Sequence, residues 1–544
     1  MNTTGRKRKQ HFQTGFIAGL LAGIIATGVM LLVSVTWNGI SLPEVFGSAL
    51  TALMPPPLFN YLHETIGGDA KHYFFYGIVV GQCLVFALIG GLYNLRFSSQ
   101  RLPWYHGLLL TLMLWLFVGF ILLPITGVGI FGAQLTIGLV NSMLSLAVVG
   151  IVFGLLFVFI RNWLTAYAPV AADTTSAASK VRAIPGESDD VVSRRTLLRR
   201  AAVLTGIAVL GVGMWRFITE GVGSTAPRLM QHFKSKIVPP PIPNYGVVHP
   251  APFLSTEVTS NDQYYIVSKN LFADPMVDGN SWKLVVDGEV EHPFVLTYQQ
   301  VLALPMRKQY ESMMCISNQV GGEYMSNALW EGIPLADLLQ RAGVKPGATK
   351  VVFYAADDYS DSIHLSKAIE LTTLMAVRMN GVALPDSHGF PARMLVPGIY
   401  GMKHCKWLTR IEVVNYDYQG YWQQRGWSDP APIRLTARID TPLDGSKVTA
   451  NRSYIAGVAF SGNRGISEVD VSTDGGQTWQ VATLKQPLSG LTWVLWELAW
   501  QPKPGSYLII ARAIDLGGNV QDPTVEPPLP NGSSGYHSIN VTVA

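Results

Sequence analysis

The sequence predicts a multi-domain chain with three parts: transmembrane helices at the N-terminus, a mixed α+β domain in the middle and an immunoglobulin-like β-sandwich at the C-terminus. The first observation is composition, because hydrophobic residues make up 49% of the 544 residues and charged residues only 14%, which is typical of chains with membrane segments. The second is a series of long apolar runs before residue 161. The third is a set of short strand patterns, separated by turn residues, over 431–544.

The apolar runs predict an all-α transmembrane unit of four helices over 1–162. A helix needs about 20 apolar residues to cross the hydrocarbon core of a bilayer, within a range of about 17 to 25. Buried helices of a soluble domain are the alternative, but several such runs in succession are rare in soluble folds. The runs cover residues 15–37, 73–95, 107–123 and 136–160.

Positive charges at the ends of these runs predict their orientation. Basic residues precede the first run, lie between the second and third, and follow the fourth, whereas the other two loops hold one Lys and no Arg. The positive-inside rule therefore puts both ends of the unit in the cytoplasm. The basic residues are Arg6, Lys7, Arg8, Lys9, Arg96, Arg101 and Arg161.

The segment between the membrane unit and the next domain predicts export. Residues 163–192 are rich in Ala, Ser, Thr and Asp and are expected to form a cytoplasmic linker. Residues 193–220 open on SRRTLLR, which resembles a twin-arginine export signal, and continue into an apolar run. A plain fifth membrane helix is the alternative, and both interpretations place the rest of the chain outside the cytoplasm. A Pro-rich spacer is expected over 221–244.

The soluble part is expected to hold two domains. Over 245–430, a helical pattern at 336–342 alternates with short strand patterns at 282–286, 351–354 and 410–414. Over 431–544, strand patterns recur at 454–460, 468–472, 493–499 and 507–515, and Asp474-Gly475-Gly476 is a strong hairpin signal. The second region predicts the β-sandwich.

Cysteine is scarce: the chain holds only Cys83, Cys315 and Cys405. Cys83 lies in an apolar run, and a disulfide between the other two is open at this stage. The absence of CxxC, CxxCH and Cys/His spacings in the sequence disfavours structural zinc and c-type haem.

Four segments around these cysteines carry a resemblance to a known family. They are CISNQVGGEYMSNALWEGIPLADLL from Cys315, YSDSIHL from Tyr359, LPDSHGFPARMLVPGIYG over 384–401, and HCKWL from His404. In this order they resemble the sulfite-oxidase family of molybdopterin-dependent oxidoreductases, over roughly 245–540. The resemblance implies a sulfite-oxidase-like molybdopterin domain over 245–430, and it implies that 431–544 is the family's dimerisation domain.

The resemblance assigns roles at the metal. A thiolate is a soft ligand that suits a redox-active transition metal, and Cys315 is expected to bind molybdenum beside two sulfurs of the pterin cofactor. A buried free thiol is the alternative. Tyr359 is expected to donate a hydrogen bond or pass a proton near the substrate oxygen, with a surface-loop tyrosine as the alternative.

Further residues are expected to bind the pterin and its phosphate. Arg and Lys charges and loop N–H groups recognise phosphate, whereas the alternative is a solvated basic surface. A looser match puts three more residues near the pterin, and Cys405 is expected to contribute packing or backbone contact. The residues are His388, Arg393, His404, Lys406, Cys405, Lys269, Asn270 and Asp357.

These patterns predict a membrane-anchored, extracytoplasmic molybdenum enzyme that transfers an oxygen atom to or from a small, sulfur-containing substrate. The residues after Cys315 include none of the arginines of sulfite oxidases proper, so the pocket is expected to be less basic. An S-oxide reductase is therefore equally compatible with the pattern, and a non-catalytic binding or assembly module is the alternative from another class. A transporter or sensor is disfavoured, because the spans are nearly free of ionisable residues.

The expected partners follow from this function. They are a membrane, a small-molecule substrate, an electron carrier such as a cytochrome or quinone, and a second copy of the chain through the C-terminal domain. Haem is disfavoured because His63, His72 and His106 do not form facing pairs within helices. The net charge of +4 gives no indication of a nucleic-acid partner.

Overall fold

The computed structural model describes residues 3–37, 39–66, 70–97, 101–166, 246–271, 273–449 and 454–544. They form two compact units, one of residues 1–50 and 71–233 and the other of 51–70 and 234–544. The predicted twin-arginine-like segment, the spacer and most of the predicted linker lie outside the described residues. Helix α7 runs to Ala166, so it continues into the first residues of that linker.

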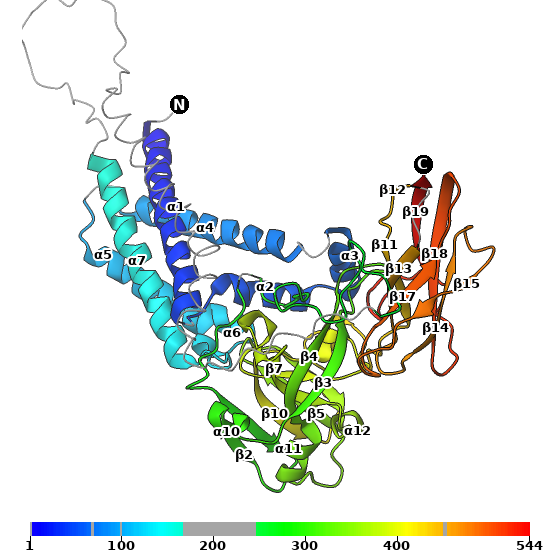
Figure 1. Cartoon of the computed structure of the whole chain (residues 1–544). Coiled ribbons are helices and arrows are strands. Elements are labelled where there is room, and N and C mark those ends of the chain that lie inside the picture. The colour runs from blue at the N-terminus through cyan, green and yellow to red at the C-terminus, as the bar shows by residue number, and fades with distance from the viewer. Residues whose placement is uncertain are drawn as a thin grey trace, which may run out of the picture. The chain divides into compact units, whose positions relative to one another are not determined.

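Among the described residues of the first unit, four helices are long and apolar enough to cross a membrane. Helices α1 and α7 contact each other along their length (Figure 1). A π-helical turn, Val118–Leu122, separates α5 from the short helix α6. The four apolar helices are α1 (Thr3–Trp37), α4 (Ala70–Arg96), the span Tyr105–Ile125 that comprises α5 (Tyr105–Phe117), the π-helical turn and α6 (Leu123–Ile125), and α7 (Leu139–Ala166). The prediction of four apolar helices is therefore confirmed.

The loop expected between the first two spans contains two helices that the apolar runs did not predict, α2 (Leu42–Leu53) and α3 (Pro56–Ile66). Helix α3 belongs to the second unit, where the ring of Phe59 lies 5.9 Å from that of Trp422 and 6.5 Å from that of Trp427. Both helices are shorter than a membrane span, so a search for long apolar runs passes over them.

The central domain contains two five-stranded sheets. In the first, the strand order is β2-β1-β10-β5-β6, and β1 is parallel to β10. In the second, the order is β3-β4-β7-β8, with β9 paired to β7. The strands are β1 (Lys283–Gly288), β2 (Phe294–Thr297), β3 (Arg307–Met314), β4 (Met325–Pro334), β5 (Lys350–Ala355), β6 (Ser360–His364), β7 (Leu374–Met379), β8 (Val382–Ala383), β9 (Arg393–Leu395) and β10 (Leu408–Val414).

Local chemistry explains where the helices of this domain begin and end. Helix α10 (Tyr298–Leu302) starts at a capping box in which the side chains of Thr297 and Gln300 each accept the other's backbone N–H. Helix α11 (Leu335–Ala342) buries its apolar residues at helical spacing and ends at Gly343, whose φ is +68°. The third helix is α12 (Leu365–Ala368). The predicted helix at 336–342 and the three predicted strands of this domain are confirmed as α11, β1, β5 and β10.

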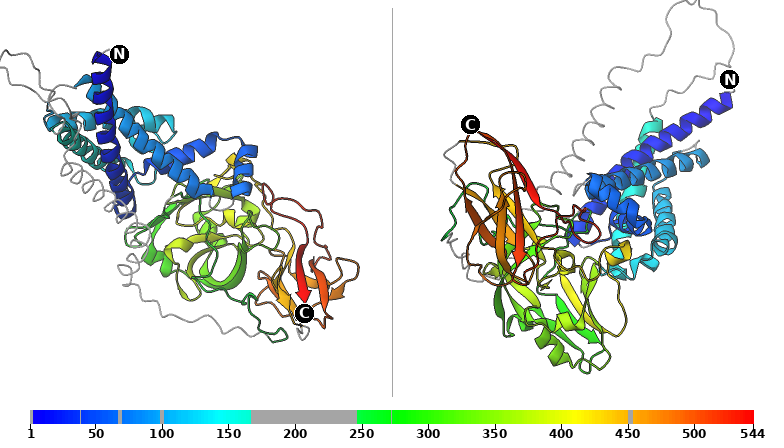
Figure 2. Two further views of the ribbon diagram at one scale, coloured as in Figure 1. Left: turned by 90° about the horizontal axis from the view of Figure 1, so that it is seen from above. Right: turned by 90° about the vertical axis from the view of Figure 1, so that its right-hand side faces the viewer.

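The C-terminal domain also contains two sheets, whose strands are seen from two further sides in Figure 2. Their orders are β11-β13-β17-β16 and β12-β19-β18-β14-β15. Buried residues of both sheets, Trp496 and Val471 among them, form one core. The strands are β11 (Thr436–Thr441), β12 (Lys447–Val448), β13 (Tyr454–Phe460), β14 (Ile466–Ser472), β15 (Gln480–Val481), β16 (Thr483–Leu484), β17 (Val494–Ala499), β18 (Gly505–Asp515) and β19 (His537–Val543). All four predicted strands and the hairpin after β14 are confirmed.

A second apolar core joins the C-terminal sheets to the central domain. It contains Met314 and Ile316, which flank Cys315, together with Trp493 and Leu495 from the region of β17. At the same place the backbone N–H of Ser312 donates to the carbonyl of Leu491 at 3.0 Å. The last residues of β3 are therefore held by both domains.

We expect Gly154→Ala to destabilise the membrane unit. Gly154 of α7 lies against the backbone of Gly107 at the start of α5, and a Cβ there would collide with the Gly107 carbonyl. A carbonyl of the helix backbone cannot move aside cheaply, so the thermal midpoint in detergent should fall. Gly81→Ala is the matched control, because nothing lies within 4 Å of its Cβ position. In α4, which carries Gly81, alanine should stabilise the helix by up to about 1 kcal/mol. Equal thermal midpoints for the two variants would contradict the close packing of Gly154 on Gly107.

Candidate active site

Cys315 lies in the turn between β3 and β4. Its backbone N–H donates to the carbonyl of Tyr324 at 2.9 Å, and its carbonyl accepts from the N–H of Asn318 at 3.1 Å. The side-chain oxygen of Asn318 accepts in turn from the N–H of Tyr324 at 2.8 Å. These bonds cross-link the turn, so the thiol is presented from a fixed backbone.

Side chains of the C-terminal domain also hold this turn. The guanidinium of Arg438 donates to the carbonyl of Gly322 at 2.8 Å, and the hydroxyl of Ser533 donates to the carbonyl of Asn318 at 2.7 Å. No sequence pattern indicates this role, because the partners lie more than a hundred residues apart. The C-terminal domain therefore positions the loop that carries the cysteine.

The thiol of Cys315 is 6% exposed, and its sulfur lies 3.0 Å from the hydroxyl oxygen of Ser317. Burial raises the pKa of this thiol above its ordinary value, although hydrogen bonding to Ser317 and the nearby backbone opposes the shift. A bound cation would reverse the effect, because a metal stabilises the thiolate. Cys315 and Cys405 are both free thiols, so the disulfide left open by the sequence is not formed.

Arg393 is a buried cation at the start of β9. Its Nη1 donates to the carbonyl of His388 at 3.2 Å and its Nη2 to the carbonyl of His404 at 3.4 Å. The guanidinium carbon lies 5.2 Å from the centre of the Trp330 ring. The residue is 4% exposed, yet its Nε has no hydrogen-bond partner. Such an unmet buried donor is costly and indicates that a ligand completes the site.

Two other buried polar atoms near Arg393 lack partners: the hydroxyl of Tyr264 and Oε1 of Glu311. Burial raises the pKa of Glu311 to about 8, so this carboxyl is largely protonated at neutral pH. It therefore does not supply a full negative charge to Arg393.

His388 and His404 are buried and neutral. Each donates from Nε2 to a backbone carbonyl, His388 to Asn261 at 2.8 Å and His404 to Ile399 at 3.1 Å. Burial lowers the pKa of His388 to about 4 and that of His404 to about 3. Burial in a low dielectric thus removes the charge of both imidazoles, so neither supplies a positive charge for a phosphate.

Lys406 and Cys405 follow His404. The ammonium of Lys406 donates to the carbonyl of Ser387 at 2.9 Å and lies 4.2 Å from the centre of the Trp407 ring. Cys405 is 1% exposed, and its sulfur lies 3.7 Å from the carbonyl oxygen of Lys406. Its backbone carbonyl accepts from the N–H of Met394, so it also ties the loop to β9.

Lys269, Asn270 and Asp357, which only a loose match suggested, lie together. The Lys269 ammonium is 3.3 Å from the side-chain oxygen of Asn270 and 4.0 Å from a carboxylate oxygen of Asp357. It also lies 5.5 Å from the centre of the Tyr421 ring. Asp357 accepts the backbone N–H of Tyr359 at 3.1 Å, which shapes the turn before β6.

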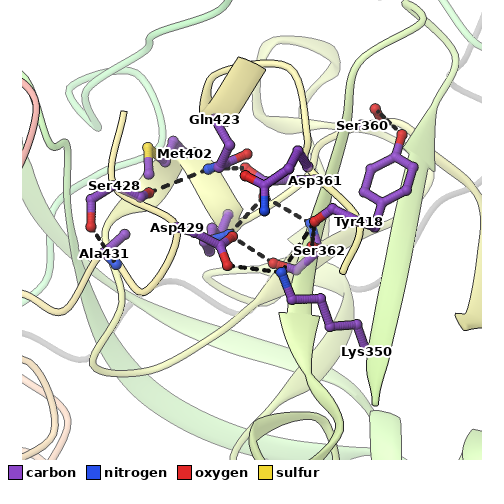
Figure 3. A network of polar contacts seen from close by, with 12 residues as sticks. Lys350, Ser360, Asp361, Ser362, Met402, Tyr418, Gln423, Ser428, Asp429 and Ala431 are labelled. Carbon is purple, nitrogen blue, oxygen red and sulfur yellow. Dashed lines mark hydrogen bonds and ion pairs between the residues drawn. The ribbon is translucent and has the colours of Figure 1, made fainter. Parts of the chain in front are cut away.

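The hydroxyl of Tyr359 contacts two acceptors. It lies 2.6 Å from the carbonyl oxygen of Met402 and 3.1 Å from Oδ2 of Asp361. Its ring centre lies 5.8 Å from that of Tyr421. Burial and the charge of Asp361 raise the pKa of Tyr359 well above its ordinary value. This tyrosine is therefore a protonated hydroxyl in a polar network and not a surface-loop residue. Figure 3 shows the part of the network around Asp361.

Tyr265, which the sequence did not single out, connects Cys315 with the residues around Arg393. Tyr265 lies close enough to both Cys315 and Arg393 for their charges to shift its pKa. Its hydroxyl packs on Gly401, where a Cβ would approach it to 2.6 Å. On the other side, Cys405 interacts electrostatically with Arg393 and Asp357. Isolated tyrosines form no local motif, so sequence reasoning passed over Tyr265.

No metal-ligating cluster of three or more His, Cys, Asp or Glu side chains occurs in the described part of the chain. Comparison with known proteins identifies two matches, one in the central domain and one in the C-terminal domain. Residues 272–422 match the oxidoreductase molybdopterin binding domain, and residues 433–528 match the Mo-co oxidoreductase dimerisation domain.

Three relatives illustrate the similarity. Human mitochondrial sulfite oxidase is 32% identical over 330 residues, covering 51% of this chain and 60% of that protein. Sulfite oxidase of Arabidopsis thaliana is 30% identical over 334 residues, covering 50% of this chain and 84% of that protein. An inducible NADH nitrate reductase of Glycine max is 28% identical over 350 residues, covering 52% of this chain and 38% of that protein. The chain thus spans less than two thirds of the human protein's length.

The two neutral histidines predict acid sensitivity. Below pH 6.5 the unfolded chain protonates both imidazoles, whereas the folded chain keeps them neutral until the pKa values of about 4 and about 3. The unfolded state therefore binds more protons in this pH window, so the free energy of unfolding decreases as the pH is lowered. We expect His404→Gln to reduce this slope by at most about 1.4 kcal/mol per pH unit.

The measurement is the thermal midpoint at several pH values between 7 and 4. Glutamine can make similar hydrogen bonds without titrating, so the variant should fold. His292→Gln, at an exposed position, is the control and should keep the wild-type slope. An undiminished slope in His404→Gln would show that His404 titrates alike in both states.

Proposed function

The chain belongs to the sulfite-oxidase family of molybdopterin-binding oxidoreductases, and on this premise we propose that it is a membrane-anchored molybdenum enzyme that transfers an oxygen atom to or from a small sulfur-containing substrate. The observation that carries the proposal is the presence of a fixed, buried thiol, Cys315, and a buried cation, Arg393, whose Nε is unmet, both near Tyr265. A soft ligand and an unsatisfied donor together suit a metal cofactor with anionic groups.

The residues present fit the molybdenum cofactor. Cys315 would hold the metal through its thiolate, and Arg393 and Lys406 would meet anionic or carbonyl groups of the pterin. His388 and His404 would act as neutral groups that fix the backbone of this cradle, with Nε2 of each already donating to a carbonyl. When bound, the cofactor would supply the two-electron oxygen-atom transfer itself.

The chain's own residues would position the substrate and manage protons. Tyr359 is a protonated hydroxyl beside Asp361 and is suited to donate to a developing negative charge on a substrate oxygen. Lys269 and Arg425 lie over the Tyr421 ring at 5.5 and 3.5 Å from its centre. They bring positive charge near Tyr359, although the turn after Cys315 contains no arginine. A small polar or anionic sulfur compound suits this environment.

Both reaction directions remain within the proposal. The relatives' names include a sulfite oxidase and a nitrate reductase, and these act on oxoanions in opposite directions. Oxidation of a sulfur compound and reduction of an S-oxide therefore both belong in the substrate screen.

The membrane unit would anchor the catalytic domain on the extracytoplasmic side. Four apolar helices support the anchor, and the positive charges around them put both of its ends in the cytoplasm. Residues 193–220, which resemble an export signal, would then carry the catalytic domain across the membrane. A cytochrome or quinone would exchange electrons with the site. The match to a dimerisation domain supports a homodimer, for which an immunoglobulin-like arrangement of the two C-terminal sheets would provide the surface.

The second candidate is a non-catalytic binding or assembly module on the same fold. It would keep the two-sheet C-terminal domain and dispense with the cofactor. The unmet donor of Arg393 disfavours it, because an apolar side chain there would stabilise a module that binds no ligand.

We expect the protein purified from membranes to contain about one molybdenum per chain, and Cys315→Ser to lose most of it. A serine hydroxyl is a harder and less acidic ligand than a thiol. Molybdenum per chain is measured in both proteins by elemental analysis. Both are produced in a host that makes the cofactor. Cys83→Ser in α4 is the matched control and should retain the metal. Wild-type protein without metal would favour the binding module.

Oxygen-atom transfer should depend on Tyr359 as well as on the metal. With sulfite and with S-oxides as substrates, we expect Tyr359→Phe to lower kcat by about 10- to 100-fold while the molybdenum content stays unchanged. The phenyl ring preserves packing and removes only the hydroxyl. Equal kcat values in variant and wild type would remove Tyr359 from the reaction.

A further inference from the structure

Five charged side chains of alternating sign form a continuous line from the neighbourhood of Tyr359 to the surface. Figure 3 labels three of them, Asp361, Asp429 and Lys350. We call the five side chains the ion array. Its members, in order from the site, are Asp361, Lys403, Asp429, Lys350 and Asp417.

Each step in the ion array is a hydrogen-bonded ion pair. Lys403 Nζ lies 2.8 Å from Oδ1 of Asp361 and 3.0 Å from Oδ1 of Asp429. Lys350 Nζ lies 2.8 Å from the other oxygen of Asp429 and 2.5 Å from Oδ1 of Asp417. Asp429, the carboxylate between the two lysines, thus uses one oxygen for each, and the line has no break.

Burial changes along the ion array from complete to slight. The side chain of Asp361 is 0% exposed and those of both lysines 2%, whereas Asp429 is 23% and Asp417 73% exposed. One end therefore faces the candidate site and the other faces solvent. The strands β5 and β6 carry Lys350 and Asp361, so the sheet fixes the spacing of these two members.

At the inner end, the geometry of Tyr359 indicates proton sharing. Its single hydroxyl proton meets two acceptor positions, the Met402 carbonyl at 2.6 Å and Asp361 Oδ2 at 3.1 Å. Both contacts are satisfied together when Asp361 carries a proton and donates it to the tyrosine oxygen. Burial also raises the pKa of Asp361 above its ordinary value, against the effect of Lys403. The protonated carboxyl is therefore within reach.

The proposed reaction needs such a connection, and the inference below rests on that proposed function. Oxidation converts substrate and one water into the oxygenated product, two protons and two electrons. Reduction consumes the same two protons and two electrons and releases water. The electrons go to or come from the carrier, whereas the protons must cross the protein to or from solvent.

We propose that the ion array is the proton route between Tyr359 and solvent, with Asp361 as the group that exchanges a proton directly with the tyrosine. During reduction, Asp417 takes up a proton from water and passes it to Lys350 as Lys350 donates to Asp429. The same exchange at Lys403 delivers a proton to Asp361 and then to Tyr359. During oxidation every transfer runs in reverse.

The charges of the ion array make this transfer feasible. Each lysine gives one proton and receives one, so all interior members return to their starting charge. The intermediates of the transfer are neutral Lys–Asp pairs. Burial disfavours charged groups, so it reduces the free-energy difference between a neutral pair and an ion pair. Other ionisable groups that face Asp361 are Tyr359, Cys405 and Tyr418.

A purely structural role is the competing explanation. The ion array also fixes backbone: Lys350 donates to the carbonyl of Tyr418 at 3.1 Å and Lys403 to that of Ser362 at 2.8 Å. The two roles differ in what the loss of one carboxylate does. Lost support alone lowers thermal stability, whereas a lost proton route slows exchange of protons at Tyr359.

The test compares Asp429→Asn with wild type in the full-length, cofactor-free protein. Time-resolved infrared spectroscopy after transfer to D₂O follows the C–O–H band of Tyr359, assigned by subtraction of the Tyr359→Phe spectrum. Asparagine keeps the shape of the side chain but cannot carry the proton. We expect the exchange rate at Tyr359 to fall at least about tenfold. Asp470→Asn, in a buried ion pair with Arg512 of the C-terminal domain, is the matched control and should leave the rate unchanged.

The exposed end provides a second variant, at a side chain that is itself 73% exposed. Asp417→Asn should slow the same exchange by about threefold, because Lys350 then receives protons only from water. An exchange rate at Tyr359 equal to wild type in both Asp417→Asn and Asp429→Asn overturns the proton route.

Turnover separates this inference from the proposed function. In molybdenum-loaded protein, Asp429→Asn should lower kcat at least about tenfold, leave KM unchanged and increase the solvent isotope effect. A wild type that turns over no sulfur compound contradicts the proposed function, and the exchange rates in cofactor-free protein still decide the proton route. Slower turnover with an unchanged isotope effect and unchanged exchange would assign Asp429 a structural role and overturn the route.

Discussion

The candidate site depends on the hydrogen bonds that the guanidinium of Arg393 donates to two backbone carbonyls. The guanidinium draws together the carbonyls of His388 and His404, which belong to two different loops. Without that cation the two carbonyls would be left without a donor in the interior, and the loops would lose their common anchor. The cation in turn is compensated by dipoles and the Trp330 ring, and within the described residues it pairs with no carboxylate. A buried positive charge held in this way makes the cradle complementary to an anion.

The fixed position of Cys315 depends on the C-terminal domain as much as on the central one. Arg438 and Ser533 satisfy carbonyls of the cysteine turn, and the shared core buries the residues on either side of the thiol. A metal ligand needs a supporting shell that prevents it from turning away. Here that shell comes from the C-terminal domain. This domain therefore supports the cysteine turn in addition to any role in dimerisation. Separating the domains would release the cysteine turn even if each remained folded.

The sequence predicted elements and motifs well, and it predicted electrostatics poorly. Period-2 and apolar patterns located β13, β17 and the four long apolar helices, because these patterns reflect the environment along one element. The motif around Cys315 identified the thiol. The neutral state of His388 and His404 could not be predicted, because their burial depends on strands and loops distant in the sequence. The ion pair of Asp361 with Lys403 joins residues 42 positions apart, so no local spacing indicates it.

The polar interior of the central domain also distinguishes between an enzyme and a passive module. Burying Asp361 and Lys403 as a pair costs desolvation that Coulomb attraction barely offsets, and apolar residues of similar volume often stabilise such a position. Arg393 adds a buried donor that remains unmet. A module selected only for stable association has no physical use for either feature. A site that must hold an anionic cofactor and move protons has a use for both, because one feature supplies the binding charge and the other links the buried tyrosine to water.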